Sequence, residues 1–403
     1  LSPSSAASDV YKRQDDLCDI LAGIEEHRVF EAKDSIPKIS VLRQYILKWS
    51  DEEFKKLFRM EKHNFENLVG IIKNNSVFHS NSLCLQMDVH VQLAVTLKRL
   101  SHDGTANSVD QLSMYFGISK GSVTEYIRRC FIAITEELGH LVQWPDKEQR
   151  ALTSKSIKSK YYFRKCIGYV DGTHFRLSQR PTVDGETYYN RKGFYSLNCQ
   201  IFCDERKIIF GLLSGQAGSV ADSTCVNNST FLRNPDEAYF SIDSTHEYLI
   251  ADSGYALHPY MLTPYRRPQI VNSEDNQDFN ILRSSARVAV ENAIGVLKGR
   301  WRFLKNIPIQ LNRPEDVEKI DESIYVCVIL HNYLIVMSDA TPIDREDTQD
   351  VVVEESDPEV VQLADIERDS TRGNTGLNRW RNSVRDMLIA DFVEDYSRRA
   401  IDG

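Results

Sequence analysis

The stretch CIGYVDGTHFRL, residues 166–177, decides the fold class, because it is an apolar run of strand length with one carboxylate inside it. A buried aspartate in a strand is unfavourable unless it is paired or bound to a metal, so Asp171 is the first candidate site residue. Further along the chain, Tyr195–Cys203 and Lys207–Ser214 flank the polar turn 204–206. This arrangement predicts a β-hairpin beside the first strand.

A second short strand and three helices are expected after the hairpin. Tyr248–Ala251 is apolar and ends at Asp252, a position from which a side chain can project from the edge of a sheet. Helical spacing of apolar residues predicts three helices. The first spans 222–233 with Asp222 as its cap, the second spans Arg283–Leu304 with Glu291 near its middle, and the third spans Ile320–Met337. Strand, hairpin, helix, strand, helix is the element order of a ribonuclease H-like α/β domain, although many α/β folds share parts of it.

Residues 36–150 are expected to be mostly helical, and one part of them has helix–turn–helix spacing. Val109–Phe116 predicts a short helix, Gly117 can take the left-handed turn conformation, and Ser119 can cap the next helix. Arg128 and Arg129 on that second helix are candidate phosphate contacts. A plain helical hairpin in a domain core is the equally weighted alternative.

The chain is expected to have four parts. These are a disordered or artefactual N-terminus over 1–35, a helical, helix–turn–helix-like domain over 36–155, an α/β domain over 156–338, and an acidic linker with a C-terminal helix over 339–403. No apolar run is long enough for a transmembrane helix, and the N-terminus lacks the apolar core of a signal peptide. The eight cysteines include no CxxC pair, which favours buried thiols such as Cys199 and Cys203 in a reducing intracellular compartment.

The net charge of −9 hides a basic middle segment. Residues 1–150 have a net charge of −2, residues 151–313 of +6 and residues 314–403 of −13. Local fields rather than the overall isoelectric point attract a polyanion. The acidic total therefore does not exclude DNA as a partner of the middle segment.

Asp171, Asp252 and Glu291 together suit a hard divalent cation, because Mg²⁺ prefers oxygen ligands and takes few carboxylates per ion. Two such ions can activate an attacking oxygen and stabilise the leaving one in phosphodiester cleavage. The alternative from the residues alone is structural: Asp252 caps a turn, Asp171 pairs with a nearby arginine, and Glu291 makes a helix salt bridge.

Five sequence blocks resemble the PIF/Harbinger group of DDE transposases and the nucleases derived from them. The blocks, in order, are YVDGTHFRL (169–177), YYNRKGFYSLNCQIFCD (188–204), LIADSGYAL (249–257), FNILRSSARVAVENAIGVLKGRWRFL (279–304) and LHNYL (330–334). The resemblance implies a ribonuclease H-like catalytic core in which Asp171, Asp252 and Glu291 are the catalytic residues and metal ligands. It departs from the family at GSVADS, where Asp222 matches an acidic position but Ala221 replaces a histidine.

The resemblance also implies an activity and partners. We expect an endonuclease or transposase that uses Mg²⁺ or Mn²⁺, acts on DNA in the nucleus, depends on a Myb/SANT-like partner protein and can form a homo-oligomer. The candidate DNA contacts in this region are Arg191, Lys192, Arg287, Lys298 and Arg302, with Arg300 on the same ridge. His174, His331 and Asn332 are expected to be structural.

Two other functions remain open at this stage. One is a catalytically silent, domesticated DNA-binding or scaffold protein, which the intact acids disfavour and Ala221 weakly favours. The other is a ribonuclease acting on RNA·DNA hybrids, which shares the fold and the metal chemistry.

Overall fold

The computed structural model describes residues 48–79, 86–241, 246–271, 273–339 and 375–402. The expected N-terminal segment 1–35 and all but the first residue of the expected acidic linker 339–371 lie outside these residues.

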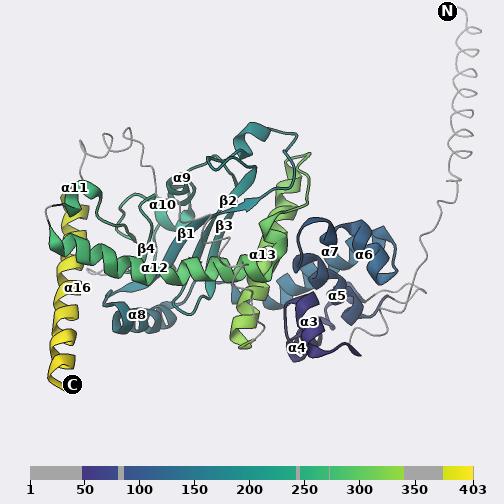
Figure 1. Ribbon diagram of the computed structural model, residues 1–403, viewed down its shortest axis with the longest axis horizontal. Helices are drawn as coiled ribbons and strands as arrows, with labels where there is room; N and C mark the ends of the chain where they lie inside the picture. The colour runs from purple at the N-terminus through teal and green to yellow at the C-terminus, as the bar shows by residue number, and fades with distance from the viewer. Residues whose placement is uncertain (1–47, 80–85, 242–245, 272, 340–374, 403) are drawn as a thin grey trace, which may run out of the picture.

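A five-stranded mixed sheet with the strand order β3-β2-β1-β4-β5 forms the centre of the α/β part (Figure 1). Its strands are β1 (Cys166–Arg176), β2 (Ser196–Cys203), β3 (Ile209–Ala217), β4 (Tyr248–Ile250) and β5 (Met261–Leu262). The strands β1, β2 and β3 are antiparallel neighbours, whereas β4 runs parallel to both β1 and β5. The predicted hairpin is confirmed as β2–β3, and Asp204 closes its turn by accepting hydrogen bonds from the backbone of Arg206 and Ile208.

The two faces of the sheet are covered by different helices, because successive side chains of a strand point to opposite sides. One face packs in the main hydrophobic core with the long helices α12 (Glu274–Arg300) and α13 (Glu315–Val336). The other face packs in a smaller core with α9 (Asp222–Asn227) and α10 (Thr230–Arg233). On β1, Tyr169 belongs to the first core and Val170 to the second.

The bounds of all three helices predicted after the hairpin differ from the structure, and the helix expected over Ile320–Met337 is α13, which spans Glu315–Val336. The helix expected over 222–233 is two helices, α9 and α10, and α12 begins nine residues before Arg283 and ends at Arg300. Ser273 caps α12 by accepting a hydrogen bond from Asn276 N, and Glu274 and Asp275 suit its first turn. A short α11 (Arg267–Ile270) precedes α12, and the C-terminal helix α16 (Thr375–Asp402) packs against it.

The described residues before β1 form helices, as predicted. They are α3 (Asp51–Phe58), α4 (Lys62–Ile72), α5 (Val89–Leu100), α6 (Val109–Phe116), α7 (Lys120–Leu138) and α8 (Lys147–Tyr161). Gly117 has a φ of 60°, in the left-handed region, and Ser119 caps α7 by accepting from Ser122 N. The sequence therefore located the α6–turn–α7 geometry. These helices share the main core with the sheet, and α8 packs directly on β1, so a separate all-α domain stays a prediction.

The buried interior contains the predicted thiols. Cys199 and Cys203 are fully buried and are not in a disulfide. Burial raises the pKa of both thiols, which keeps them protonated and unreactive at neutral pH. Among the described helices, none is both long enough and apolar enough to traverse a bilayer.

Candidate active site on β1, after β4 and on α12

Asp171 lies on β1 between a buried valine and Gly172. It pairs across the sheet with Ile201, which places its side chain on the face that α12 covers. The side chain is 13% exposed. A carboxylate held at this depth needs a cationic partner or a metal ion.

Asp252 follows the end of β4, as the sequence predicted, and its side chain is 29% exposed. The chain at this point is fixed by Arg283 of α12, which donates from Nε to the carbonyl oxygen of Ala251 at 3.1 Å and also from Nη2. Because β4 lies beside β1 in the sheet, these contacts bring Asp252 next to Asp171.

Glu291 lies on α12 and completes a row of three charged side chains. Arg283, Arg287 and Glu291 are spaced four residues apart, so they lie on one face of the helix. Glu291 is the most exposed of the candidate acids, at 37%. It therefore lies at the solvent side of the site.

The guanidinium of Arg287 joins the three acids. Nη2 donates to Asp171 Oδ2 at 2.7 Å, Nη1 donates to Asp252 Oδ1 at 2.9 Å, and Nη1 lies 3.7 Å from Glu291 Oε1. Burial lowers the pKa of Arg287, but the charges of Asp171 and Asp252 outweigh it and raise the pKa overall. The structure thus brings the three predicted acids together around one cation. The same contacts match the structural alternative, in which Asp171 pairs with an arginine and Glu291 makes a salt bridge within its helix.

Carboxylates from three elements fit a hard divalent cation by the chemistry of the donor set. Among the described residues, however, no three His, Cys, Asp or Glu side chains lie close enough to share one ion. Arg287 lies between the acids, and its Nε is buried with no hydrogen-bond partner in the described structure. The carboxylate oxygens are donors of the kind that a divalent metal ion prefers, and the guanidinium of Arg287 lies between them.

A fourth acid, Asp222, lies beside this site on the other face of β1. A Cβ on Gly172 would be 2.4 Å from Asp222 Oδ1, so only glycine allows this approach. Asn198 and Gln200 of β2 donate to the same oxygen at 2.9 and 2.8 Å. Asp222 is the first residue of α9 with Ala221 as N-cap, so the predicted capping role is wrong.

Tyr255 is linked to Asp222 through Gln200. Its buried hydroxyl donates to Gln200 Oε1, and Gln200 in turn donates to Asp222. Burial raises the pKa of Tyr255, and the charges of Asp222, Asp171 and Asp252 raise it further, so the phenol stays protonated. Sequence reasoning missed Asn198, Gln200 and Tyr255, whose roles depend on contacts between residues far apart in the chain.

Two of the candidate DNA contacts in the α/β part are accessible and the others are engaged within the protein. Arg191 is exposed and Lys192 is half-buried. Lys298 is buried and donates to His174 O at 3.1 Å. Arg302 lies beyond the end of α12 and is 3.3 Å from Asp103. Arg287 likewise binds the candidate acids. Most of the cations that were expected to form a DNA-facing ridge on α12 are therefore directed into the protein.

On α7, the two candidate arginines share one acidic partner. Arg128 is exposed and makes a two-pronged contact with Glu125. Arg129 donates to both Glu125 and Gln86. Neither contact buries Arg128, so this side chain remains reachable from solvent.

Of the histidines expected to be structural, His331 is buried in the core and His174 is half-buried. Burial lowers the pKa of both His174 and His331 to about 4. His174 Nδ1 lies 3.1 Å from Ser196 Oγ, and His331 Nε2 lies 2.9 Å from Lys207 O. Asn332 bonds both the N–H and the carbonyl of Ile209, which fixes β3 on α13.

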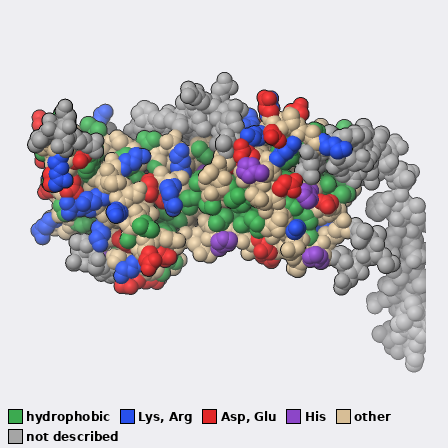
Figure 2. All heavy atoms as spheres, turned by 90° about the horizontal axis from the view of Figure 1, so that it is seen from below, with side chains coloured by type: hydrophobic (Ala, Val, Ile, Leu, Met, Phe, Trp, Pro, Cys, Tyr) green, Lys and Arg blue, Asp and Glu red, His purple; other side chains and the backbone are tan. Residues whose placement is uncertain are grey.

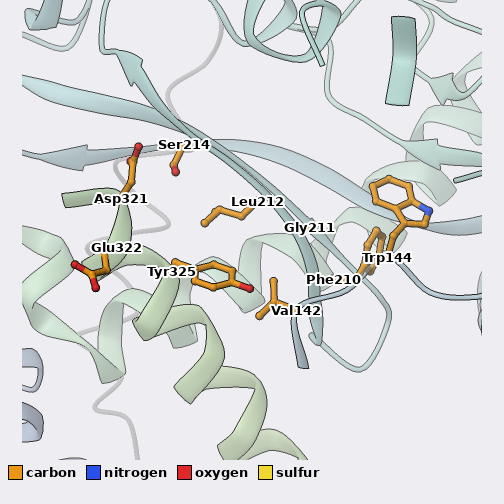
Figure 3. Close-up of a pocket in the computed structure, with 9 residues that line it drawn as sticks. All are labelled: Val142, Trp144, Phe210, Gly211, Leu212, Ser214, Asp321, Glu322 and Tyr325. Atoms are coloured by element: carbon orange, nitrogen blue, oxygen red, sulfur yellow. The ribbon is translucent and has the colours of Figure 1, made fainter. Parts of the chain in front are cut away.

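A well-formed cavity in the described structure does not contain the three candidate acids. It has a volume of about 540 Å³ and lies between β3 and α13, with Trp144 and Tyr325 among its lining residues (Figure 3). Its polar side chains are Ser214, Asp321 and Glu322. The candidate active site is instead a partly buried group of acids on β1, just after β4 and on α12.

Comparison with known proteins gives a family for this region. Residues 170–332, which contain all three candidate acids, match the DDE superfamily endonuclease family. The chain is 26% identical to an ALP1-like protein of Arabidopsis thaliana, over 72% of this chain and 73% of that protein. It is 28% identical to HARBI1 of Rattus norvegicus and 26% identical to HARBI1 of Homo sapiens, both named as candidate nucleases. Each HARBI1 match covers 54% of this chain and 59% of the relative.

No solved structure matches the chain. The family match and the relatives agree with the resemblance carried by the five sequence blocks. Residues 170–332 therefore form a DDE superfamily endonuclease domain, and the chain is homologous to the Harbinger transposase-derived nucleases.

Proposed function

We propose that the chain is a metal-dependent DNA endonuclease of the ribonuclease H-like type, in which Asp171, Asp252 and Glu291 hold two Mg²⁺ or Mn²⁺ ions. The observation that carries the proposal is that all three acids lie around a single guanidinium, although they come from three separate elements. The strand order, with antiparallel β1–β3 and parallel β4, supports the same fold type.

The metal ions would supply an activated oxygen nucleophile and stabilise the leaving oxygen. The chain's own part is to fix the acids. Asp171 is held by its strand, Asp252 by the bonds of Arg283 to the preceding carbonyl, and Glu291 by α12. Asp222 adds negative charge on the other face of β1, against Gly172, and is itself fixed by Asn198 and Gln200.

DNA is the proposed substrate because the endonuclease region is the basic part of the chain. Lys155, Lys158 and Lys160 of α8 are exposed in addition to Arg191, and such cations dominate non-specific affinity for phosphate. Figure 2 shows Lys and Arg side chains more densely at the end of the viewed face that holds α16 than at the end that holds α3–α7. A Myb/SANT-like partner, a nuclear location and a homo-oligomer belong to the same proposal.

Cleavage of supercoiled plasmid with Mg²⁺ or Mn²⁺ tests the proposal. We expect metal-dependent nicking that Asp171→Asn, Asp252→Asn and Glu291→Gln each reduce by about 10³-fold or more, because each removes a ligand of the reacting ions. Asp278→Asn, an exposed aspartate on the same helix α12, is the matched control and should cut like the wild type.

The alternative is a catalytically silent DNA-binding or scaffold protein, which Ala221 and the guanidinium between the acids favour. It predicts DNA binding without cleavage, with either metal and with a Myb-like partner added. Nicking that persists in all three acid variants would overturn the site assignment.

A further inference from the structure

The position of Arg287 suggests how the site is kept stable without metal. We propose that Arg287 is the internal counter-cation of the metal-free site, and that divalent cations bind by displacing its guanidinium from Asp171 and Asp252. The inference rests on the proposed metal-dependent function and adds a residue that controls metal entry. Arg287 is then a positioning residue, because it acts on the acids and not on the substrate.

The charges around Arg287 are unbalanced. Three carboxylates lie within 4 Å of its guanidinium, and Asp222 lies against Gly172 on the other face of β1. Arg283 is the other nearby cation, and its Nη2 is 3.6 Å from Asp252 Oδ1. Buried like charges repel strongly, so the site without Arg287 would favour any cation that can enter.

The two arginines of α12 differ in how firmly they are held. Arg283 is 4% exposed and bonds a backbone carbonyl through both Nε and Nη2, so it stays with the chain. Arg287 bonds only side chains here, and its Nε is buried without a partner among the described residues. Its contact with Glu291, at 3.7 Å, is longer than a normal hydrogen bond.

The acids also leave a route for exchange. Glu291 is 37% exposed and flanks the guanidinium on the solvent side, so an arriving cation meets it first. Asp171 and Asp252 would hold a divalent ion through carboxylate oxygens that now accept from Arg287, so the ion and the guanidinium would compete for them. Metal affinity is therefore reduced by the free energy with which Arg287 stabilises the metal-free site.

Replacement of Arg287 by an uncharged side chain of similar length separates its effect on the stability of the metal-free protein from its effect on metal affinity. We expect Arg287→Met to lower the melting temperature in EDTA by about 5 °C, because it leaves partly buried acids unpaired. Calorimetric titration of the same variant should give about tenfold tighter Mn²⁺ binding, equivalent to about 1.4 kcal/mol. Saturating Mn²⁺ should then raise its melting temperature more than it raises that of the wild type.

Arg180→Met is the matched control, since Arg180 makes an exposed ion pair with Glu186. It should change neither the melting temperature nor the affinity for Mn²⁺. Arg287→Lys keeps one positive charge but cannot bridge two carboxylates as a guanidinium does, so its values should fall between wild type and Arg287→Met. Should Arg287→Met not fold in EDTA, Arg287→Lys carries the comparison.

Two results would overturn the inference, and they are distinguishable. A folded Arg287→Met or Arg287→Lys protein that binds Mn²⁺ with equal or lower affinity than the wild type would contradict the exchange alone. Absence of Mn²⁺ binding in the wild type and in both variants would contradict the proposed metal site, and the exchange with it.

Discussion

Two buried arginines of this chain show the difference between a structural and a functional ion pair. Arg150 of α8 is 1% exposed, donates from Nε to Glu247 at 2.7 Å, and gives its other N–H groups to the backbone carbonyls of Pro145, Glu237 and Ala238. The single positive charge of Arg150 is paired with the single negative charge of Glu247, which also accepts a hydrogen bond from Ser241 N. Arg287 instead meets three carboxylates and leaves its Nε without a partner in the described structure.

The difference teaches what to look for in a site of this kind. A structural pair satisfies every donor and balances its charges, so nothing is gained by exchanging either partner. A site that holds metal ions needs surplus negative charge that a resident cation only partly offsets. The arrangement around Arg287 has this surplus, and the one around Arg150 does not.

The largest effect is expected at the structural pair. Arg150→Met should lower the free energy of unfolding by about 3–5 kcal/mol, because Glu247 and three carbonyls lose their buried partner. Urea denaturation measures the loss, and Mn²⁺ should not restore it. A loss below about 1 kcal/mol, or recovery with Mn²⁺, would break the distinction between the two arginines.

The sequence located features that depend on neighbouring residues. The α6–α7 turn follows from Gly117 and Ser119, and the β2–β3 hairpin from its polar turn. The candidate acids could be found because an aspartate in an apolar strand is conspicuous, and because the sequence blocks resemble a family. The start of α12 has a local signal too, in the cap Ser273 and the acids after it, although the predicted start was Arg283.

The remaining features depend on contacts over long sequence separations. Arg287 was expected to contact phosphate, yet it bonds Asp252 and Asp171, which lie 35 and 116 residues away in the chain. Asp222 was expected to cap a helix, and instead it accepts hydrogen bonds from β2. Helical periodicity places a side chain on a face but does not say what covers that face, which is why these two roles required the structure.

A smaller effect is expected at Gly172, where the backbone of β1 approaches Asp222. Gly172→Ala should lower the free energy of unfolding by about 2–3 kcal/mol, because the new Cβ displaces Asp222 and breaks the hydrogen bonds that it accepts from Asn198 and Gln200. Thermal denaturation would measure it.

The control for this substitution is Gly70→Ala, which lies in the helix α4 with no atom within 4 Å of the new Cβ. It should be neutral or stabilise the protein by up to about 1 kcal/mol. If Gly172→Ala is tolerated as well as Gly70→Ala, the close approach at Gly172 does not fix the position of Asp222. Its charge could then not be counted with the charges of the candidate acids.

The smallest effect is expected at Tyr255, which tests whether hydrogen bonding or burial holds the network beside the acids. Tyr255→Phe should destabilise the protein by about 1 kcal/mol, since Gln200 Oε1 loses its donor while the ring remains in place. Tyr248 offers a matched control, because its hydroxyl is also buried but has no hydrogen-bond partner among the described residues. Tyr248→Phe should therefore be neutral or stabilising. Equal effects of the two substitutions in thermal denaturation would mean that Tyr255 contributes packing alone, and that Gln200 does not need the phenol to hold Asp222 in place.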